Sequence, residues 1–399
     1  MYKKIVSAVK TAVVPTVLSI FRITTQMGNT FFGTQKTFEY FGISGHPLEL
    51  PTCDLATAIS GADAIVNNAP YIYSRANNNT PLSDTASPAS QLRLSTRVLY
   101  EGLRSLGPTS FTLSAVANIL GAYVFASNIQ DMIVGSDNSD EEWRTNSALS
   151  YALAATMCNF IFQWWQRNPR VELNVRRFAH ALQNGEIHFD AKLAKATVLS
   201  LPTLSTPFIA YFSTESSLKN LPYIVLGTTP ITTLSSASAF SAFFVNIFTE
   251  AAAVYDSIGQ EEDNSNPKVP KGCQVYKGAS YFFGGFNALV NYPAYTFISI
   301  ANTFKSLGLN PYSQASIAFS VTCSVFKPIQ VFAFSARQNY QGLLGAWLKE
   351  HPPEPDLEAG VEQPLLTEEN QSFYGSSINN ADVVPTSQAS NSRTSLSVV

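Results

Sequence analysis

Two neighbouring apolar runs constrain this chain most strongly. Residues 279–304 and 311–334 are rich in aliphatic, aromatic and small side chains, and a short turn around Gly308 joins them. The first run contains no charged residue. A helix needs about 20 apolar residues to cross the hydrocarbon core of a bilayer, and each run is longer than that. The pair therefore predicts a transmembrane hairpin.

The same hairpin pattern occurs earlier in the chain. Each copy has a proline, a lysine twelve residues later, and a Pro-Tyr pair that opens the next apolar run. The prolines are 86 positions apart, and so are the lysines. This spacing predicts a duplicated hairpin. The matched residues are Pro207 with Pro293, Lys219 with Lys305, and Pro222 with Pro311.

Charged residues are scarce and segregated. They make up 13% of the 399 residues, about half of the usual ~25%, and they lie mostly between the apolar runs. The net charge of −3, without a basic stripe, argues against nucleic-acid binding.

From the apolar runs and the segregated charges we predict an all-α fold. The chain would be a polytopic helical membrane protein whose direct partner is the lipid bilayer. The predicted transmembrane bundle covers residues 108–335, with six spans at 109–130, 147–166, 196–214, 221–251, 279–304 and 311–334.

Basic residues predict the orientation of these spans. The loop 167–195 holds six lysines and arginines, whereas the turns at Lys219 and Lys305 hold one each. Because cytoplasmic loops carry the excess of positive charge, both termini are predicted to be cytoplasmic. The fourth span is too long for one straight crossing and should tilt, bend or break between Gly227 and Pro230.

The flanking regions differ from the bundle. Residues 1–107 predict a mainly polar, cytoplasmic region with an interfacial amphipathic helix at 5–21; a span, a secretory signal and an organellar transit peptide are the alternatives for that segment. Residues 41–90 are rich in Pro, Asn, Ser, Thr and Ala, and residues 77–81 within them predict an irregular loop. Residues 336–351 predict an amphipathic juxtamembrane helix. Residues 352–399 have too few large apolar groups to fold and predict a disordered tail.

Lys327 is the clearest single candidate for a functional residue in the predicted spans. A lysine near the middle of a span costs about 3 kcal/mol and commonly marks a functional site. Glu250 and Asp131 are its candidate partners. In the alternative interpretation, which we prefer, the span covers residues 306–326 and Lys327 extends to the membrane boundary.

Amide side chains within the spans form a second candidate site. Asn246, Asn287 and Asn291 could line a substrate path beside helices that prolines weaken, as in many transporters. Alternatively, they hold the helices together through hydrogen bonds worth roughly 0.6 kcal/mol each. We prefer the second interpretation.

Enzyme signatures are missing from the sequence. The four histidines do not combine with acidic residues at ligand spacing, and no nucleophile elbow, phosphate loop or dinucleotide fingerprint occurs. The four cysteines form no close pair. We therefore predict a protein without catalytic activity, metal or cofactor.

The C-terminal tail contains two short motifs. Glu362, Leu365 and Leu366 are similar to acidic dileucine sorting signals, although the acid lies one position closer than usual. Ser397 and Val399 fit the Ser-x-Val end that PDZ domains bind. A cytosolic adaptor or a PDZ-type partner is thus predicted for the tail. Its composition also resembles export signals of effector proteins from intracellular bacteria.

Two functions follow from these observations. The preferred hypothesis is a non-enzymatic membrane scaffold or interaction protein that acts through its cytoplasmic loops and tail. The alternative is a small-solute transporter or channel that uses the polar seam of the bundle.

Overall fold

The computed structural model describes residues 13–76, 88–134, 141–258 and 271–335, together with residue 344. These residues are helical almost throughout and include no strand, which confirms the predicted all-α class. The N-terminal and central helices are α2 (Val14–Tyr40), α3 (Glu49–Ala76), α4 (Leu94–Val134), α5 (Glu141–Asn184), α6 (Ala191–Leu199) and α7 (Thr206–Asn220). They are followed by α8 (Thr228–Asn246), α9 (Ala252–Ser257), α10 (Lys271–Ser306) and α11 (Gln314–Gln330).

Short segments of other helix types connect or extend these helices. Two are 3₁₀ turns, η2 (Ala89–Gln91) and η3 (Leu201–Ser205). Two are π-helical, η4 (Ile247–Ala251) after α8 and η5 (Val331–Ser335) after α11. The first interrupts one long helix, which continues as α9, and the second follows the end of α11.

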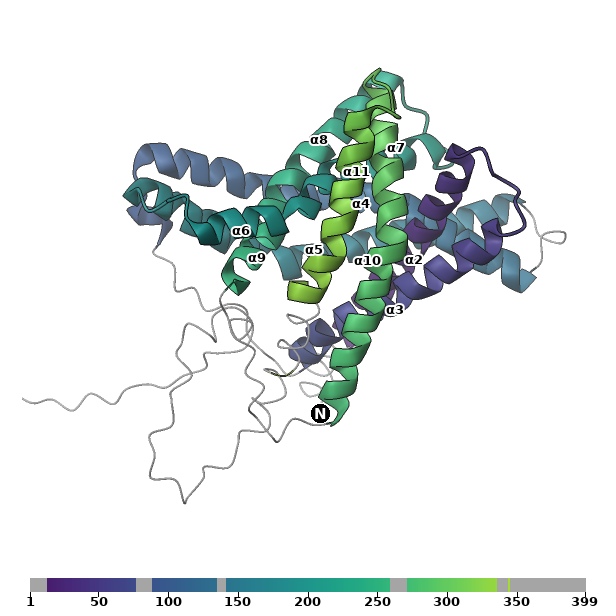
Figure 1. Ribbon diagram of the computed structural model, residues 1–399. Helices are drawn as coiled ribbons and strands as arrows, with labels where there is room; N and C mark the ends of the chain where they lie inside the picture. The colour runs from purple at the N-terminus through teal and green to yellow at the C-terminus, as the bar shows by residue number, and fades with distance from the viewer. Residues whose placement is uncertain (1–12, 77–87, 135–140, 259–270, 336–343, 345–399) are drawn as a thin grey trace, which may run out of the picture.

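Figure 1 shows how the helices are arranged. The pair α10 and α11 runs along the height of the molecule, and α4 and α5 cross behind it. The helices α2 and α3 lie on one side of this crossing, while α6 and α9 lie on the other. The described chain is therefore a set of helical layers that cross, in which α4 contacts α2, α5, α7 and α8.

The turn between α10 and α11 follows from its residues. Gly308 has a φ of +72°, and the amide of Leu309 donates to the carbonyl oxygen of Phe304 at 2.8 Å. This glycine-based bond ends α10. The hydroxyl oxygen of Ser313 then accepts from the amide of Ser316 at 3.2 Å and caps the start of α11.

Three described helical segments are long and apolar enough to cross a membrane: Leu94–Ile133, Thr228–Ser257 and Gln314–Ser335. They contain the first predicted span and overlap most of the fourth and the sixth.

Polar side chains face inward and apolar side chains face outward on α11. Its exposed residues are spaced by three or four, so they form one stripe. The buried positions between them are mostly polar, which is the reverse of a helix on a water-soluble protein. The stripe consists of Ile317, Val321, Val325, Ile329 and Phe332, and the buried positions include Ser316, Ser320, Cys323 and Gln330.

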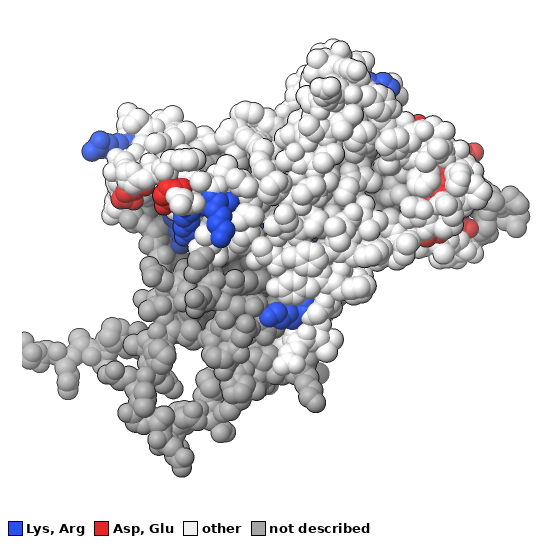
Figure 2. Space-filling model, viewed as in Figure 1, with Lys and Arg blue, Asp and Glu red and all other residues white. Residues whose placement is uncertain are grey.

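The same reversal occurs on α8. Ser235, Ser238 and Ser241 are at most 2% exposed, whereas Leu234 and Phe240 are 37% and 59% exposed. Figure 2 shows that the face over α8, α10 and α11 is nearly free of charged side chains, which gather toward its edges.

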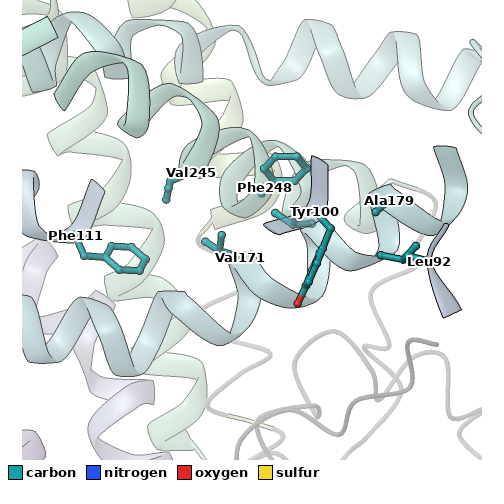
Figure 3. Packing of buried hydrophobic residues seen from close by; sticks show 8 residues of the cluster. Leu92, Tyr100, Phe111, Val171, Ala179, Val245 and Phe248 are labelled. Atoms are coloured by element: carbon teal, nitrogen blue, oxygen red, sulfur yellow. The ribbon is translucent and has the colours of Figure 1, made fainter. Parts of the chain in front are cut away.

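A conventional apolar core lies where α4 and α5 meet the end of α8 (Figure 3). Phe111 of α4, Val171 of α5 and Val245 of α8 are at most 2% exposed. Leu92, Tyr100, Val175, Ala179 and Phe248 complete the cluster. This cluster packs α4 and α5 against the end of α8, one of the helices that expose apolar side chains.

The helices α7 and α10 run parallel to each other. The hydroxyls of Ser205, just before α7, and Tyr292 of α10 are 2.5 Å apart. Further along both segments, Glu215 of α7 accepts from Asn302 and Ser306 of α10. The partners are thus 87 to 91 positions apart in the chain.

The N-terminal region differs from its prediction. In the polar region 41–90, α3 occupies Glu49–Ala76 and packs against α2 and α10, whereas the loop predicted at 77–81 lies outside the described residues. The sequence does not single out this helix because small residues such as Ala56, Ser60 and Gly61, which permit close helix packing, have low hydrophobicity. In addition, α2 continues well beyond the predicted helix at 5–21, of which residues 5–12 lie outside the described residues.

Three predicted elements in the middle of the chain also need correction. The first part of the loop predicted at 167–195 is helical, because α5 continues through Pro169 to Asn184. The third span is divided into α6, η3 and α7, because Pro202 and Pro207 interrupt the backbone bonding. The fourth span begins only at Thr228, since Leu221–Gly227 is not helical.

Several predictions fall on other parts of the chain. The juxtamembrane helix lies outside the described residues except at position 344, and the tail at 352–399 lies wholly outside them. The tail motifs at Glu362, Leu365, Leu366, Ser397 and Val399 therefore stay predictions.

Candidate functional site

A polar cavity of about 250 Å³ lies among α2, α3, α4, α7 and α10. Of the described residues that line it, one is aliphatic and none is charged. The rest present hydroxyl or amide groups. At ~30 Å³ per water molecule, a cavity of this size has room for roughly eight. The lining comprises Gln26, Asn29, Thr30, Thr34, Ser60, Asn118, Ile209, Ser213, Asn287, Asn291, Tyr292 and Tyr295.

Two of the sequence-predicted asparagines line this cavity together. Asn287 and Asn291 are one turn apart on α10, and the Asn291 amide donates to the Asn287 carbonyl oxygen at 2.8 Å. The same Asn291 nitrogen donates to the backbone oxygen of Ala56 on α3 at 3.0 Å. The side-chain oxygen of Asn291 is buried and has no hydrogen-bond partner in the described structure.

A carboxylate that the sequence analysis missed anchors this pair. Asp63 of α3 is 7% exposed and accepts from the Asn287 amide at 2.7 Å and from the Asn67 amide at 3.0 Å. Burial raises the pKa of Asp63 above its ordinary value, and the bond from Asn287 and the positive charge of Lys327 act in the opposite direction. Asp63 lies outside the three candidate spans. A helical assignment for residues 49–76 would have placed it on the face with Ala56 and Ser60.

Two tyrosines and a pair of helices close the other walls. The Tyr295 and Ser213 hydroxyls are 2.7 Å apart, and the Tyr292 hydroxyl donates to the carbonyl oxygen of Pro202 at 3.0 Å. Across the cavity, the Asn29 amide of α2 donates to the Asn118 oxygen of α4 at 2.6 Å. The polar lining is thus held in place by hydrogen bonds between different helices.

Lys327 is adjacent to this site and does not line it. Its ammonium lies 5.2 Å from the centre of the Tyr292 ring and 3.1 Å from the side-chain oxygen of Gln330. The predicted partners are wrong: Glu250 pairs with Arg167, and Asp131 pairs with Arg144. Both arginines belong to α5, which packs against α4 and η4, the segments that hold Asp131 and Glu250.

Asn246 is not part of the cavity. Its amide donates to the backbone oxygen of Ala242 at 2.7 Å, and its oxygen accepts from Arg167 at 3.3 Å. Arg167 also donates to Glu250 at 3.2 Å. This group joins α5 to the end of α8, so the structure separates Asn246 from Asn287 and Asn291.

Compared with protein-family models, curated proteins and solved structures, the chain matches none.

Proposed function

We propose that the chain is a multi-pass membrane protein that binds small, uncharged polar solutes in this cavity and carries them across the bilayer. The observation that carries the proposal is the cavity itself, which is polar and without charged lining among the described residues, in a bundle whose α8 and α11 expose apolar side chains. Ligand sites of helical membrane proteins lie between helices and use a few placed polar groups for orientation.

The reversed polarity of α8 and α11 supports a membrane location. In water, an exposed stripe such as that of α11 would be an aggregation site. In lipid, the same side chains are solvated, and small hydroxyl residues between helices permit close packing. The segments Leu94–Ile133, Thr228–Ser257 and Gln314–Ser335 are the spans we rely on first.

The finer topology is also a proposal. Six spans, with both termini cytoplasmic, require that α5, α10 and the broken η3–α7 segment cross as well. Because α4 and α5 cross behind α10 and α11, at least one pair must be tilted in the bilayer (Figure 1). Helices of 41 and 44 residues are long enough for strong tilt.

The duplicated hairpin gains support from the parallel packing of α7 and α10. Their hydrogen-bonded residues are 82 to 91 positions apart, a range that includes the sequence repeat of 86. Two copies related by an axis along the membrane normal would place equivalent helices side by side and parallel. The copies differ at their prolines, because Pro207 opens α7 whereas Pro293 lies within α10.

The transport proposal is tested by solute flux into proteoliposomes that contain the full chain. Glycerol, erythritol and urea represent uncharged solutes, and acetate and choline represent ions. We expect flux of at least one uncharged solute and none of the ions. Asn291→Leu should lower that flux about tenfold, because loss of one hydrogen bond to solute is worth about 1.4 kcal/mol.

Matched variants complete the test. Val290→Leu changes the neighbouring exposed position of α10 and should leave the flux unchanged. Deletion of residues 352–399 should also leave it unchanged. Absence of flux for every solute would contradict transport, and loss of function in cells upon the deletion alone would favour the scaffold role predicted for the loops and tail.

A further inference from the structure

The hydrogen bonds that end at Asp63 have a defined direction. A carboxylate only accepts, so the Asn287 amide nitrogen faces Asp63 and its carbonyl oxygen faces Asn291. The Asn291 nitrogen consequently points toward two acceptors, Asn287 and the backbone oxygen of Ala56. The orientation of both amides thus follows from the charge state of Asp63.

The orientation of the Asn287 and Asn291 amides leaves one hydrogen-bond acceptor for a solute. Asn291 lines the cavity, and its side-chain oxygen is buried and has no donor within the described chain. A buried acceptor without a donor costs free energy, so a solute gains by binding where its O–H or N–H can reach this oxygen.

The surroundings of Asp63 permit it to change charge. On α3 it contacts Asn67, and the α2 side chains that pack nearest, around Ser60 and Gly61, are Gln26, Met27 and Thr30, all uncharged. On α10 the facing groups are Asn287 and Tyr276, whose hydroxyl donates to the Val66 carbonyl oxygen. From α11, Lys327 acts at longer range. No described lysine or arginine forms an ion pair with Asp63.

We propose that Asp63 is a proton-binding site that controls solute binding through Asn287 and Asn291. The inference rests on the proposed function. A proton from water adds to the Asp63 carboxylate, which then donates an O–H to the Asn287 carbonyl oxygen. Asn287 rotates its amide to accept, so its nitrogen then faces the Asn291 nitrogen. Asn291 rotates in turn, gives up its bond to Ala56, and turns its oxygen toward Asn287 and away from the solute.

The coupling has a definite sign. Solutes that donate hydrogen bonds bind better when Asp63 is ionised and worse when it is protonated. Because linkage is reciprocal, solute binding favours release of the proton from Asp63. Asp63 is a positioning residue in this scheme, since it acts through the two asparagines without touching the solute.

The test is the pH profile of glycerol flux into proteoliposomes, together with infrared spectra of the purified full chain. We expect the flux to fall several-fold as the pH is lowered, and a protonated carboxyl band to grow over the same range. Glycerol should shift that band's midpoint to lower pH. Asp63→Asn, whose amide can donate as the protonated acid does, should give low flux that does not vary with pH. Asp54→Asn, an exposed position of the same helix, should keep the original profile.

Other outcomes would overturn the proposal. A flux that is independent of pH in the original chain would do so, as would an Asp63→Asn variant with the original profile. If Asp63→Asn does not fold, Asn287→Ala serves instead, because it removes the relay and keeps the carboxyl; retention of the pH dependence in this variant contradicts the coupling. If no solute is carried at any pH, transport itself fails, while the infrared midpoint and its response to glycerol still test Asp63.

Discussion

Glu215 of α7 is a buried carboxylate with partners on two helices. It is 5% exposed and accepts from Lys219 at 2.6 Å, from Asn302 at 2.6 Å and from Ser306 at 3.1 Å. The last two donors belong to α10. Glu215 therefore fixes the register of α7 against α10 near the C-terminal ends of both helices.

Replacing Glu215 with leucine should destabilise the protein by about 1–3 kcal/mol, because the hydrogen bonds that this buried carboxylate accepts from the half-buried Asn302 amide and the exposed Ser306 hydroxyl are lost. Unfolding in detergent by increasing denaturant measures this change. Lys219→Ala is the matched control, since its side chain is 51% exposed and a pair at such a site contributes about 0–1 kcal/mol. Equal losses in both variants would contradict the role of Glu215 between helices.

The sequence predicts some of these residues and not others. Asn287 and Asn291 were recognisable because amides are rare within long apolar runs. Asp63 was not predicted because its surroundings are only mildly apolar and no helix is evident there from sequence. The predicted partners of Lys327 were wrong because spacing along the chain does not give distances between helices.

At the scale of helices, α2 and α4 approach most closely at two glycines. A methyl group added to Gly28 would overlap the carbonyl oxygen of Gly121, and one added to Gly121 would overlap the Asn29 side chain. Small residues at a crossing bring two backbones into contact, as in membrane helix pairs.

Gly121→Ala should therefore separate α2 from α4 and lower stability by roughly 1–3 kcal/mol, as overpacking does elsewhere. Gly102→Ala, on the same helix with no atom within 4 Å, should instead stabilise by about 0.5–1 kcal/mol through helix propensity. Thermal unfolding in detergent distinguishes the two, and a stabilising Gly121→Ala would show that the helices are not in contact there.

The outward stripe of α11 makes a separate prediction. With the four native cysteines replaced by alanine, spin labels at Val321 and Val325 should be accessible to oxygen dissolved in the bilayer and shielded from a water-soluble nickel complex. A label at Ser320, which is 3% exposed, should be shielded from both. Access of the nickel complex to Val321 and Val325 would place α11 in water.

Element boundaries were predictable where the physical signals are local. The end of α10 at Gly308 and the start of α11 at Ser313 follow from turn and capping residues. The division of the third span was also accessible, because Pro202 and Pro207 lie five positions apart. The continuation of α5 through Pro169 was not accessible, since packing against α4 overrides the local preference of a proline.

At the scale of the whole molecule, two features must be explained together. Buried positions are rich in Ser, Thr and Asn, and a polar cavity whose described lining is uncharged lies between the helices. Large apolar side chains lie instead on the surface of α8, α10 and α11. A bilayer accounts for both, because lipid solvates the outer stripes and leaves the polar groups to bond with each other or with a solute.

The most direct test of this account is alkaline carbonate extraction of membranes from cells that express the full chain. Integral proteins stay in the membrane pellet under these conditions, and the account predicts that the whole population does so. Recovery of folded, monodisperse protein in the supernatant, without detergent, would contradict it.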